Sequence, residues 1–347
     1  MNTRKGTRPT IRDVARMANV SKMTVSRVIN HLPSVNTETR ARVLEIIDKV
    51  GYTPDPSARR LASRRPFLIG LIYDNPNAPY VVKIQEGALE AVRRRGFELL
   101  VHPCQQDSAT FLPQIQTKIR QQRLDGVILL PPVSESVELT ALLKSEQCPY
   151  VKVISAQLDA PENMVVYMDR LAVADIAKHL VDLGHTRIAM ISGPSNYRSS
   201  IERLTGFKQA LEDLGLPLQE QYHAKGSYNF ESGVECGTEL LSLPEPPTAI
   251  FAGNDETAGG VYRAAYLKNV RIPDQLTVIG YDDSPLAQIL CPSLTTMHQP
   301  IFDIGRLAAE RVISKIDGDA GVPAGTISFV PNLIVRGSSA PPKKGAA

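Results

Sequence analysis

The segment TIRDVARMANVSKMTVSRVIN, residues 10–30, predicts two short helices joined by a tight turn. Thr10 can cap the first helix, with Asp13 as its acidic partner three residues later. Apolar residues then recur at helical spacing until Asn19 and Ser21 interrupt them, and Ser21 can cap the second helix. That helix is apolar on one side and polar and basic on the other. The segment indicates a helix-turn-helix whose second helix lies in the major groove of DNA. A helical hairpin with solvated charges is the alternative.

Charge is distributed unevenly along the chain. Residues 1–65 contain 14 Lys and Arg against 5 Asp and Glu, whereas the remaining residues contain 25 against 31. A basic module joined to a mildly acidic body is typical of nucleic-acid binding. The charge pattern therefore favours DNA binding over the solvated hairpin. It also predicts an affinity that falls steeply with salt, because each phosphate contact releases condensed counterions.

A third helix is expected from residue 37 to about residue 50. Asn36 can cap it, and Gly51 suits the left-handed position just past its end. Its apolar side would be formed by Val43, Leu44, Ile46, Ile47 and Val50. Three helices in about 50 residues give a small core, of marginal size for a domain.

The next segment, YTPDPSARRLAS at residues 52–63, ends this helical region. Pro54 and Pro56 prevent continuation of the third helix. From Ser57 onward the residues favour a helix, but one too short to be stable without a partner. The segment is therefore either a plain linker or a linker that folds when it is bound.

Residues 12–30 and 39–62 resemble the DNA-binding headpiece and hinge of the LacI/GalR family of bacterial repressors. The most specific motifs are VS-x-x-TVSRV-x-N and Y-x-P-x-x-x-A-x-x-L-A. The resemblance implies that Lys22, Met23 and Arg27 read base edges, with Arg27 contacting guanine through its guanidinium. It assigns phosphate contacts, which position the protein on DNA, to Thr10, Thr24, Ser26 and Asn30, and Ser21 completes the DNA-binding set.

The resemblance also implies that residues 57–63 form a hinge helix in the minor groove. Leu61 would act as an apolar wedge that kinks the DNA, and Ala58 would be the small residue at which two such helices pack. The expected domains are a headpiece at 1–54, a hinge at 55–65 and an effector-binding and dimerisation domain at 66–340.

Beyond residue 66, short apolar runs alternate with helical stretches. The apolar runs are 67–72, 97–102, 126–130 and 150–154, then 187–192, 248–252 and 276–281. The helices are expected near 80–95, 110–122 and 135–145, then 170–183, 199–214, 230–242 and 255–268. Continuous apolar strands that alternate with helices form parallel sheets covered on both faces. The fold class is therefore α/β, with two doubly wound subdomains and one ligand cleft beyond the carboxyl ends of their strands.

This body also resembles the LacI/GalR family, which extends a periplasmic sugar-binding fold. The motifs are LGHTRIAMISGP (183–194), ERLTGF (202–207), AGNDETAGG (252–260), GYDDSPLA (280–287) and LTTMHQP (294–300). The resemblance implies that the chain crosses between subdomains near residues 165, 298 and 330. The N-subdomain would comprise about 66–165 plus 299–328, and the C-subdomain about 166–298 plus 329–340.

The residues expected at the strand ends are carboxylates, amides, one arginine and aromatic rings. This mixture suits a polyhydroxylated ligand, whose hydroxyl groups donate and accept hydrogen bonds at once. The resemblance assigns effector contacts to Arg203, Asn254, Asp282 and Gln299, aromatic stacking to Tyr228 and a polar contact to Ser199; Asp74 and Tyr80 complete the candidate set. For each of these residues a helix cap or a structural hydrogen bond is the alternative. Arg170 departs from the asparagine that many family members carry, which puts any effector contact from it in doubt.

Signatures of enzymes, metal sites and membrane proteins are missing from the sequence. The phosphate-binding loop, the dinucleotide-binding loop and the nucleophile elbow are all absent. The four cysteines are scattered without metal-binding spacing, no apolar run reaches 18 residues, and the N-terminus lacks a signal-peptide core. We expect a cytoplasmic protein with no catalytic residues, no cofactor and no metal site.

The sequence as a whole predicts a homodimeric transcriptional repressor of carbohydrate-utilisation genes. Two headpieces would bind half-sites of a pseudo-palindromic operator in double-stranded DNA, and a sugar or glycoside in the cleft would control this binding. The C-terminal residues contain no heptads, which argues against a coiled-coil tetramer. Two alternatives remain: a sugar-binding protein or a carbohydrate enzyme with the same body fold. A purine or another small metabolite is the alternative effector.

Overall fold

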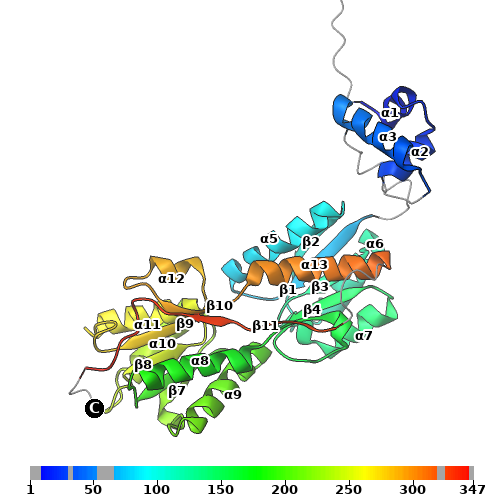
Figure 1. Ribbon diagram of the computed structural model, residues 1–347. Helices are drawn as coiled ribbons and strands as arrows, with labels where there is room; N and C mark the ends of the chain where they lie inside the picture. Colours follow the sequence, from blue (N-terminus) through cyan, green and yellow to red (C-terminus); the bar gives the residue numbers. More distant parts are fainter. Residues whose placement is uncertain (1–8, 30–33, 53–65, 319–324, 344–347) are drawn as a thin grey trace, which may run out of the picture. The chain divides into compact units, whose positions relative to one another are not determined.

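The computed structural model describes residues 9–29, 34–52, 66–318 and 325–343. The chain forms two compact units, Met1–Pro66 and Phe67–Ala347 (Figure 1). Asn30, Ala58 and Leu61, for which DNA contacts are expected, lie outside the described residues. Within the described ranges, no helix is long and apolar enough to span a membrane.

The first unit contains the three helices that the sequence predicts: α1 (Ile11–Met17), α2 (Lys22–Ile29) and α3 (Thr37–Val50). Each helix begins at a polar cap. The Thr10 backbone N–H and hydroxyl both donate to Asp13 Oδ2, at 3.0 and 2.7 Å. The Thr24 N–H donates to Ser21 Oγ at 3.0 Å, and the N–H of residue 39 donates to Asn36 Oδ1 at 2.8 Å.

The three helices enclose one small apolar core. Its fully buried members are Val14, Ala15, Ala18, Val25, Val28 and Val43. Leu44 corrects an expectation, because it is 44% exposed and does not belong to this core. It follows Val43 directly, and one residue along a helix is a turn of about 100°, which directs the leucine away from the buried side.

In the described residues, the second unit contains two six-stranded sheets, which confirms the α/β prediction. The first sheet has the order β2–β1–β3–β4–β5–β11, and all its neighbours are parallel. Its strands are β1 (Leu68–Tyr73), β2 (Glu98–Pro103), β3 (Gly126–Leu129), β4 (Tyr150–Ile154), β5 (Met164–Tyr167) and β11 (Ile327–Phe329).

The second sheet has the order β7–β6–β8–β9–β10–β12. It is parallel except for the last pair, β10 and β12. Its strands are β6 (Ile188–Ser192), β7 (His223–Lys225), β8 (Ala249–Ala252), β9 (Thr277–Asp282), β10 (Thr295–His298) and β12 (Asn332–Ile334).

Helices cover both faces of each sheet, as doubly wound folds require. On the first sheet, α5 (Ala78–Arg94) and α13 (Ile301–Asp317) pack on one face, and α6 (Phe111–Gln122) and α7 (Val137–Ser145) pack on the other. On the second sheet, α8 (Asp169–Asp182) and α9 (Arg198–Asp213) lie opposite α10 (Phe230–Leu240) and α11 (Asp255–Leu267), with α12 (Pro285–Ile289) beside α11. Each sheet with its helices is called a lobe below, the first lobe containing β1 and the second β6.

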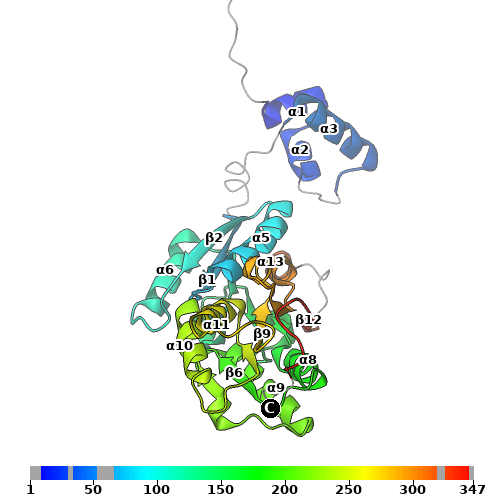
Figure 2. The same ribbon diagram turned by 90° about the vertical axis from the view of Figure 1, so that its left-hand side faces the viewer.

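The chain passes between the lobes at three places: from β5 to α8, from β10 to α13, and from β11 to β12. Helix α13 therefore returns to the first lobe, where it lies beside α5 (Figures 1 and 2). The two helices approach so closely that a Cβ on Gly87 would lie 1.9 Å from the Phe302 carbonyl oxygen. Glycine is required at such a contact. The close packing holds α5 and α13 together; α5 contributes Tyr80 to the site described next, and Gln299 of that site lies just before α13.

Candidate functional site

A narrow cavity of about 50 Å³ lies where the loops at the strand ends of the two lobes meet. Seven of the eight side chains predicted to bind an effector line it: Tyr80, Ser199, Arg203, Tyr228, Asn254, Asp282 and Gln299. The first lobe contributes Tyr80 from the first turn of α5, and the second lobe contributes most of the others. Residues far apart in the sequence are thus gathered around one space.

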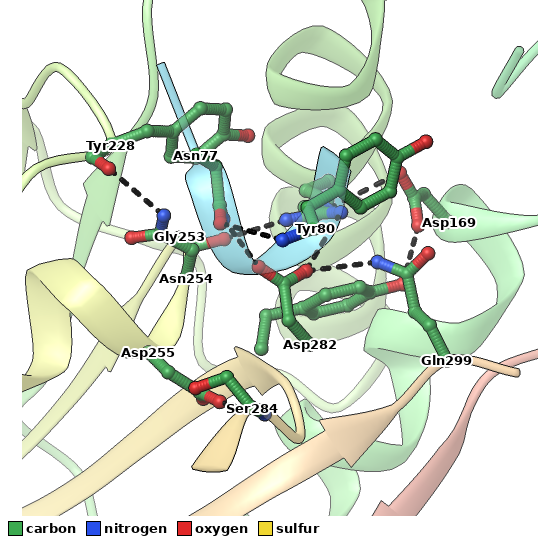
Figure 3. A network of polar contacts seen from close by, with 12 residues as sticks. Asn77, Tyr80, Asp169, Tyr228, Gly253, Asn254, Asp255, Asp282, Ser284 and Gln299 are labelled. Atoms are coloured by element: carbon green, nitrogen blue, oxygen red, sulfur yellow. Dashed lines mark hydrogen bonds and ion pairs between the residues drawn. The ribbon is translucent and has the colours of Figure 1, made fainter. Parts of the chain in front are cut away.

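Asp282, the last residue of β9, bridges the two lobes (Figure 3). Its Oδ1 accepts a hydrogen bond from Gln299 Nε2 at 3.0 Å, and its Oδ2 accepts one from Asn77 Nδ2 of the first lobe at 3.2 Å. Burial raises the pKa of Asp282 to about 7, and the guanidinium of Arg203 only partly offsets this effect. The carboxyl group therefore titrates near neutral pH.

Asp255 holds the turn that follows Asp282. One of its carboxylate oxygens accepts the Ser284 N–H at 2.7 Å, and the other accepts the Thr296 hydroxyl at 2.6 Å. The turn needs this support because Asp282 and Asp283 both have positive φ angles, 110° and 53°. Burial raises the pKa of Asp255 to about 6. Its role is to position the end of β9.

Arg203 is buried and held from several sides. Its Nε donates to Asp169 Oδ2 at 3.2 Å, and its Nη1 donates to the Gly253 carbonyl oxygen at 2.7 Å. The guanidinium stacks on the Tyr281 ring at 3.6 Å from the ring centre, and the Tyr281 hydroxyl donates to Asp169. Arg203 Nη2 also lies 3.8 Å from Asp282 Oδ1. The arginine is thus fixed and neutralised by Asp169, a positioning residue that no motif in the sequence indicated.

Asn254 and Tyr228 are linked to each other. Asn254 caps α11 by accepting the N–H of residue 257 at 2.9 Å, and its Nδ2 donates to the Tyr228 carbonyl oxygen at 3.0 Å. The hydrogen bond that Asn254 accepts is that of a helix cap, which is the alternative role considered for it from the sequence. The Tyr228 ring lies against Gly193, where an added Cβ would come within 2.2 Å of the ring. This glycine leaves the space that the aromatic ring occupies.

Three buried polar atoms around the cavity form no hydrogen bond of ordinary geometry among the described residues, although Tyr167 lies near the Tyr80 hydroxyl and Ser199 near the Tyr228 hydroxyl. They are the hydroxyls of Tyr80 and Tyr228 and the Oε1 atom of Gln299. An unpaired buried polar group costs about 1–3 kcal/mol and needs an explanation in a folded protein. A ligand with several hydroxyl groups would supply the missing partners.

Asp74 corrects a sequence-based expectation, because it is not among the residues that line the cavity. Its carboxylate accepts the Gln106 N–H at 2.8 Å, so it holds the loop after β2. Asn75 and Asn77, from the same loop as Asp74, line the cavity instead, together with Tyr167 and Tyr197 and others. The Asn77 side chain accepts the Tyr80 N–H at 3.1 Å, which caps α5 and could have been recognised as a helix start.

In the first unit, the exposed side of α2 carries the predicted base-reading side chains. Lys22, Met23 and Arg27 are exposed, and Met23 has 64% of its surface open to solvent. Val25 and Val28, on the opposite side, are fully buried. An exposed methionine between basic residues is unusual on a soluble surface and suits an apolar contact with a partner.

The hydroxyls of the other predicted residues in the first unit are already engaged. Ser21 Oγ and Thr24 Oγ1 lie 2.9 Å apart in the cap of α2, and Thr10 is bonded to Asp13 at the start of α1. Ser26 is half-buried on α2. Elsewhere in the described ranges, no group of three or more histidine, cysteine or acidic side chains could hold a metal ion.

Comparison with known proteins places these features in context. Residues 10–55 match the model of the bacterial regulatory proteins of the lacI family, and residues 177–339 match that of a periplasmic binding protein-like domain. The chain is 33% identical to the HTH-type transcriptional regulator DegA of Bacillus subtilis (strain 168), over 96% of this chain and 98% of that protein. It is 32% identical to the ribose operon repressor of Escherichia coli (strain K12), over 95% of this chain and 99% of that protein.

Among solved structures, the lac repressor dimer bound to operator and the anti-inducer ONPF superimposes with a TM-score of 0.74. Its identity to this chain is 25%, and the match covers 96% of this chain and 100% of that one. These matches confirm the resemblance seen in the sequence, since they span the headpiece and the body together. The chain belongs to the LacI family of bacterial regulatory proteins, and it is a DNA-binding transcriptional regulator.

Proposed function

We propose that the cavity between the lobes binds a neutral sugar or glycoside, which controls DNA binding by the headpiece. The observation that carries this proposal is the set of three unpaired polar atoms, from Tyr80, Tyr228 and Gln299, around one cavity. Asp282 would accept hydrogen bonds from sugar hydroxyls, Arg203 would donate to a sugar oxygen, and the Tyr228 ring would stack on an apolar sugar face. The similarity to a ribose operon repressor supports the same ligand class.

The proposed DNA contacts are those of the exposed side of α2. Lys22, Met23 and Arg27 would contact base edges. Thr10, Ser21, Thr24, Ser26 and Asn30 would position the headpiece on phosphates, and Ala58 and Leu61 would act in the hinge. We propose a homodimer that represses carbohydrate-utilisation genes from a pseudo-palindromic operator. The similarity to a repressor dimer solved on its operator supports this assembly. A cytoplasmic location and the lack of enzymatic activity belong to the same proposal.

Control by the ligand would act through closure of the lobes. Among the described residues, the lobes are joined near the cavity by Asn77 to Asp282 at 3.2 Å, the Tyr197 hydroxyl to the Asp74 carbonyl oxygen at 3.4 Å, and the Arg198 N–H to the Glu135 carboxylate at 3.1 Å. A ligand shifts such an equilibrium only by binding one state more tightly than the other, typically by about 1–3 kcal/mol. Closure around the sugar would then alter the spacing of the headpieces in the dimer.

Removal of the unpaired hydroxyls tests the proposal. A thermal-shift screen of ribose, galactose, cellobiose and adenine should first identify a sugar that raises the melting temperature. Tyr80→Phe and Tyr228→Phe should then weaken binding of that sugar about tenfold without lowering protein stability, because neither hydroxyl forms a hydrogen bond of ordinary geometry within the described residues. Tyr266→Phe is the matched control, since Tyr266 is 72% exposed and away from the cavity. A shift with adenine and with no sugar would overturn the ligand class.

A further inference from the structure

A second cavity of about 500 Å³ lies between the lobes and shares no lining residue with the first. The first lobe contributes the hydroxyl side chains of Ser155, Thr326 and Ser328, and the second lobe contributes Arg170, Arg198 and Glu202. Of these residues, the functions described above use only the backbone N–H of Arg198, which donates to Glu135. Their chemistry differs from that of the first cavity, because two guanidinium groups line the second cavity and one buried guanidinium group lines the first.

Both arginines in this cavity place their Nε atom near the Glu202 carboxylate, which accepts a hydrogen bond from Arg170 Nε but pairs with Arg198 Nε by charge alone. Arg170 Nε lies 2.6 Å from Glu202 Oε2, and Arg198 Nε lies 2.8 Å from Glu202 Oε1. The Glu202 side chain is only 7% exposed, whereas those of Arg170 and Arg198 are 52% and 37% exposed. One buried carboxylate thus orients two partly exposed guanidinium groups. Among the described residues, Glu202 is the only carboxylate that pairs with the Arg170 and Arg198 side chains, and both side chains are partly exposed, so their terminal amino groups can reach an outside acceptor.

Other groups at the cavity add hydrogen-bond donors of the same kind. Ser155 is 6% exposed, and its hydroxyl has no hydrogen-bond partner among the described residues. The first turn of α8 also lines the cavity, through Arg170 and Leu171, and a helix N-terminus attracts negative charge. The lining therefore offers donors from two guanidinium groups, hydroxyls and a helix start, whereas its one carboxylate is already neutralised. Glu135, which accepts the Arg198 backbone N–H, does not line the cavity.

We propose that this second cavity binds the phosphate group of a small metabolite. A phosphate has enough acceptor oxygens to engage both arginine forks and the Ser155 hydroxyl at once, and arginine forks recognise phosphate by paired hydrogen bonds. The open volume leaves room for the organic part of a phosphate ester. The site goes beyond the proposed sugar site, and it gives the regulator a second small-molecule input.

The two cavities are linked through adjacent residues on the same two helices. On α8, Asp169 faces the first site and Arg170 lines the second; on α9, Arg203 lines the first and Glu202 lines the second. Each cavity therefore has its own ion pair between α8 and α9: Asp169 with Arg203, and Arg170 with Glu202. A phosphate that draws Arg170 toward itself acts on the same helix pair that holds Arg203. The second ligand is thus placed to alter how the first site binds.

Calorimetric titration of the full chain tests the proposal, with inorganic phosphate, ribose 5-phosphate and ribose as probes at constant ionic strength. We expect wild-type protein to bind both phosphate compounds. Arg170→Gln and Arg198→Gln should each weaken this binding at least tenfold. Arg120→Gln is the matched control, because Arg120 also pairs with a glutamate, Glu146, at 2.7 Å, but on the surface of the first lobe. It should bind phosphate as the wild type does.

Ser155→Ala keeps the test decisive if the arginine variants fold poorly. Removal of an unpaired hydroxyl should leave the melting temperature unchanged or higher, while phosphate affinity falls several-fold. Undetectable phosphate binding by the wild type at about 10 mM would overturn the proposal, as would unchanged binding by Arg170→Gln and Ser155→Ala. If ribose binds as tightly as ribose 5-phosphate, the sugar and not the phosphate is recognised, and the proposal is also overturned. The sugar titrations of the first site are separate, so the two proposals fail independently.

Discussion

Replacement of Asp282 with asparagine should stabilise the second unit increasingly as the pH rises. Burial raises the pKa of this carboxyl from 3.8 to about 7. A group whose pKa is higher in the folded state contributes stability that is fully present below its unfolded pKa. That stability is lost as the pH rises through the folded value. One pKa unit corresponds to 1.36 kcal/mol, so ionised Asp282 costs the folded state about 4 kcal/mol. Asparagine has the same size and cannot ionise.

Only part of this cost falls within a practical pH range. At pH 5 the carboxyl is already ionised in the unfolded state but not in the folded state, so part of the cost is already present. The stability advantage of Asp282→Asn should therefore grow by about 2–3 kcal/mol between pH 5 and pH 8. Asparagine also loses one of the two hydrogen bonds that Asp282 accepts from Gln299 and Asn77. That loss, about 1 kcal/mol, does not depend on pH and leaves the slope unchanged.

Urea unfolding of both proteins at pH 5, 6, 7 and 8, followed by circular dichroism, measures this difference. Glu135 also titrates near neutral pH, but it is present in both proteins and cancels, whereas Asp255 repels ionised Asp282 and adds to the destabilisation that asparagine relieves. Asp274→Asn is the control, because Asp274 is paired with Lys343 and Arg271 at the surface and its pKa is lowered. Its stability difference from the wild type should be constant from pH 5 to pH 8. A constant or shrinking advantage for Asp282→Asn would refute the reasoning.

Three further predictions concern DNA and ligand binding. Arg27→Ala should weaken binding to a duplex selected by the wild type by about 1–3 kcal/mol and relax its selectivity, as measured by fluorescence anisotropy. Arg16→Ala is the control: it removes an ion pair with Asp13 on α1 and should leave the selectivity unchanged. Gly193→Ala places a Cβ 2.2 Å from the Tyr228 ring and should weaken sugar binding about tenfold by calorimetry, because the ring must move; unchanged affinity would contradict the assigned stacking role. A chain that begins at Phe67 should lose retention on heparin but keep the sugar-induced rise in melting temperature, and equal retention of both chains would contradict the role of the headpiece.

The headpiece was the most predictable part of the chain, because its determinants are local. Helical spacing, the caps at Thr10, Ser21 and Asn36, and Gly51 with its φ of 63° specify three helices without reference to distant residues. The prediction that Leu44 belongs to the apolar side of α3 is wrong, because an apolar residue next to the buried side widens the hydrophobic stripe in the sequence. Only packing against the other helices decides which of two neighbours is covered.

The strands divide in the same way. The long apolar runs that became β1, β4, β6 and β9 were predicted, since a buried parallel strand is apolar throughout. Others, including β7, β10, β11 and β12, were not, because they contain three or four residues, several of them polar. Strands this short gain their structure from the neighbour they pair with, which a local pattern does not reveal.

The site shows a further limit. Strand-end positions identified Asp282 and Gln299, because parallel strands end at a common edge. The same rule failed for Asp74, since the chain there turns its carboxylate toward the Gln106 N–H and presents Asn77 to the cavity. It also overlooked Asp169, because an acidic residue at the start of a helix is ordinarily a solvated partner of the helix dipole. Here it is fully buried against Arg203, which only the packing of α8 on α9 reveals.

The unpaired atoms of the first cavity explain how a small molecule can control this fold. Among the described residues, hydrogen bonds of 3.1–3.4 Å join the lobes near the cavity, and each contributes about 1 kcal/mol net. Together these bonds contribute only a few kcal/mol to closure without ligand. The unpaired atoms of Tyr80, on the first lobe, and Tyr228, on the second, gain partners only when a ligand lies between them. These hydroxyls therefore allow a ligand to bind the closed state of the lobes more tightly than the open state, which is what shifts the equilibrium toward closure.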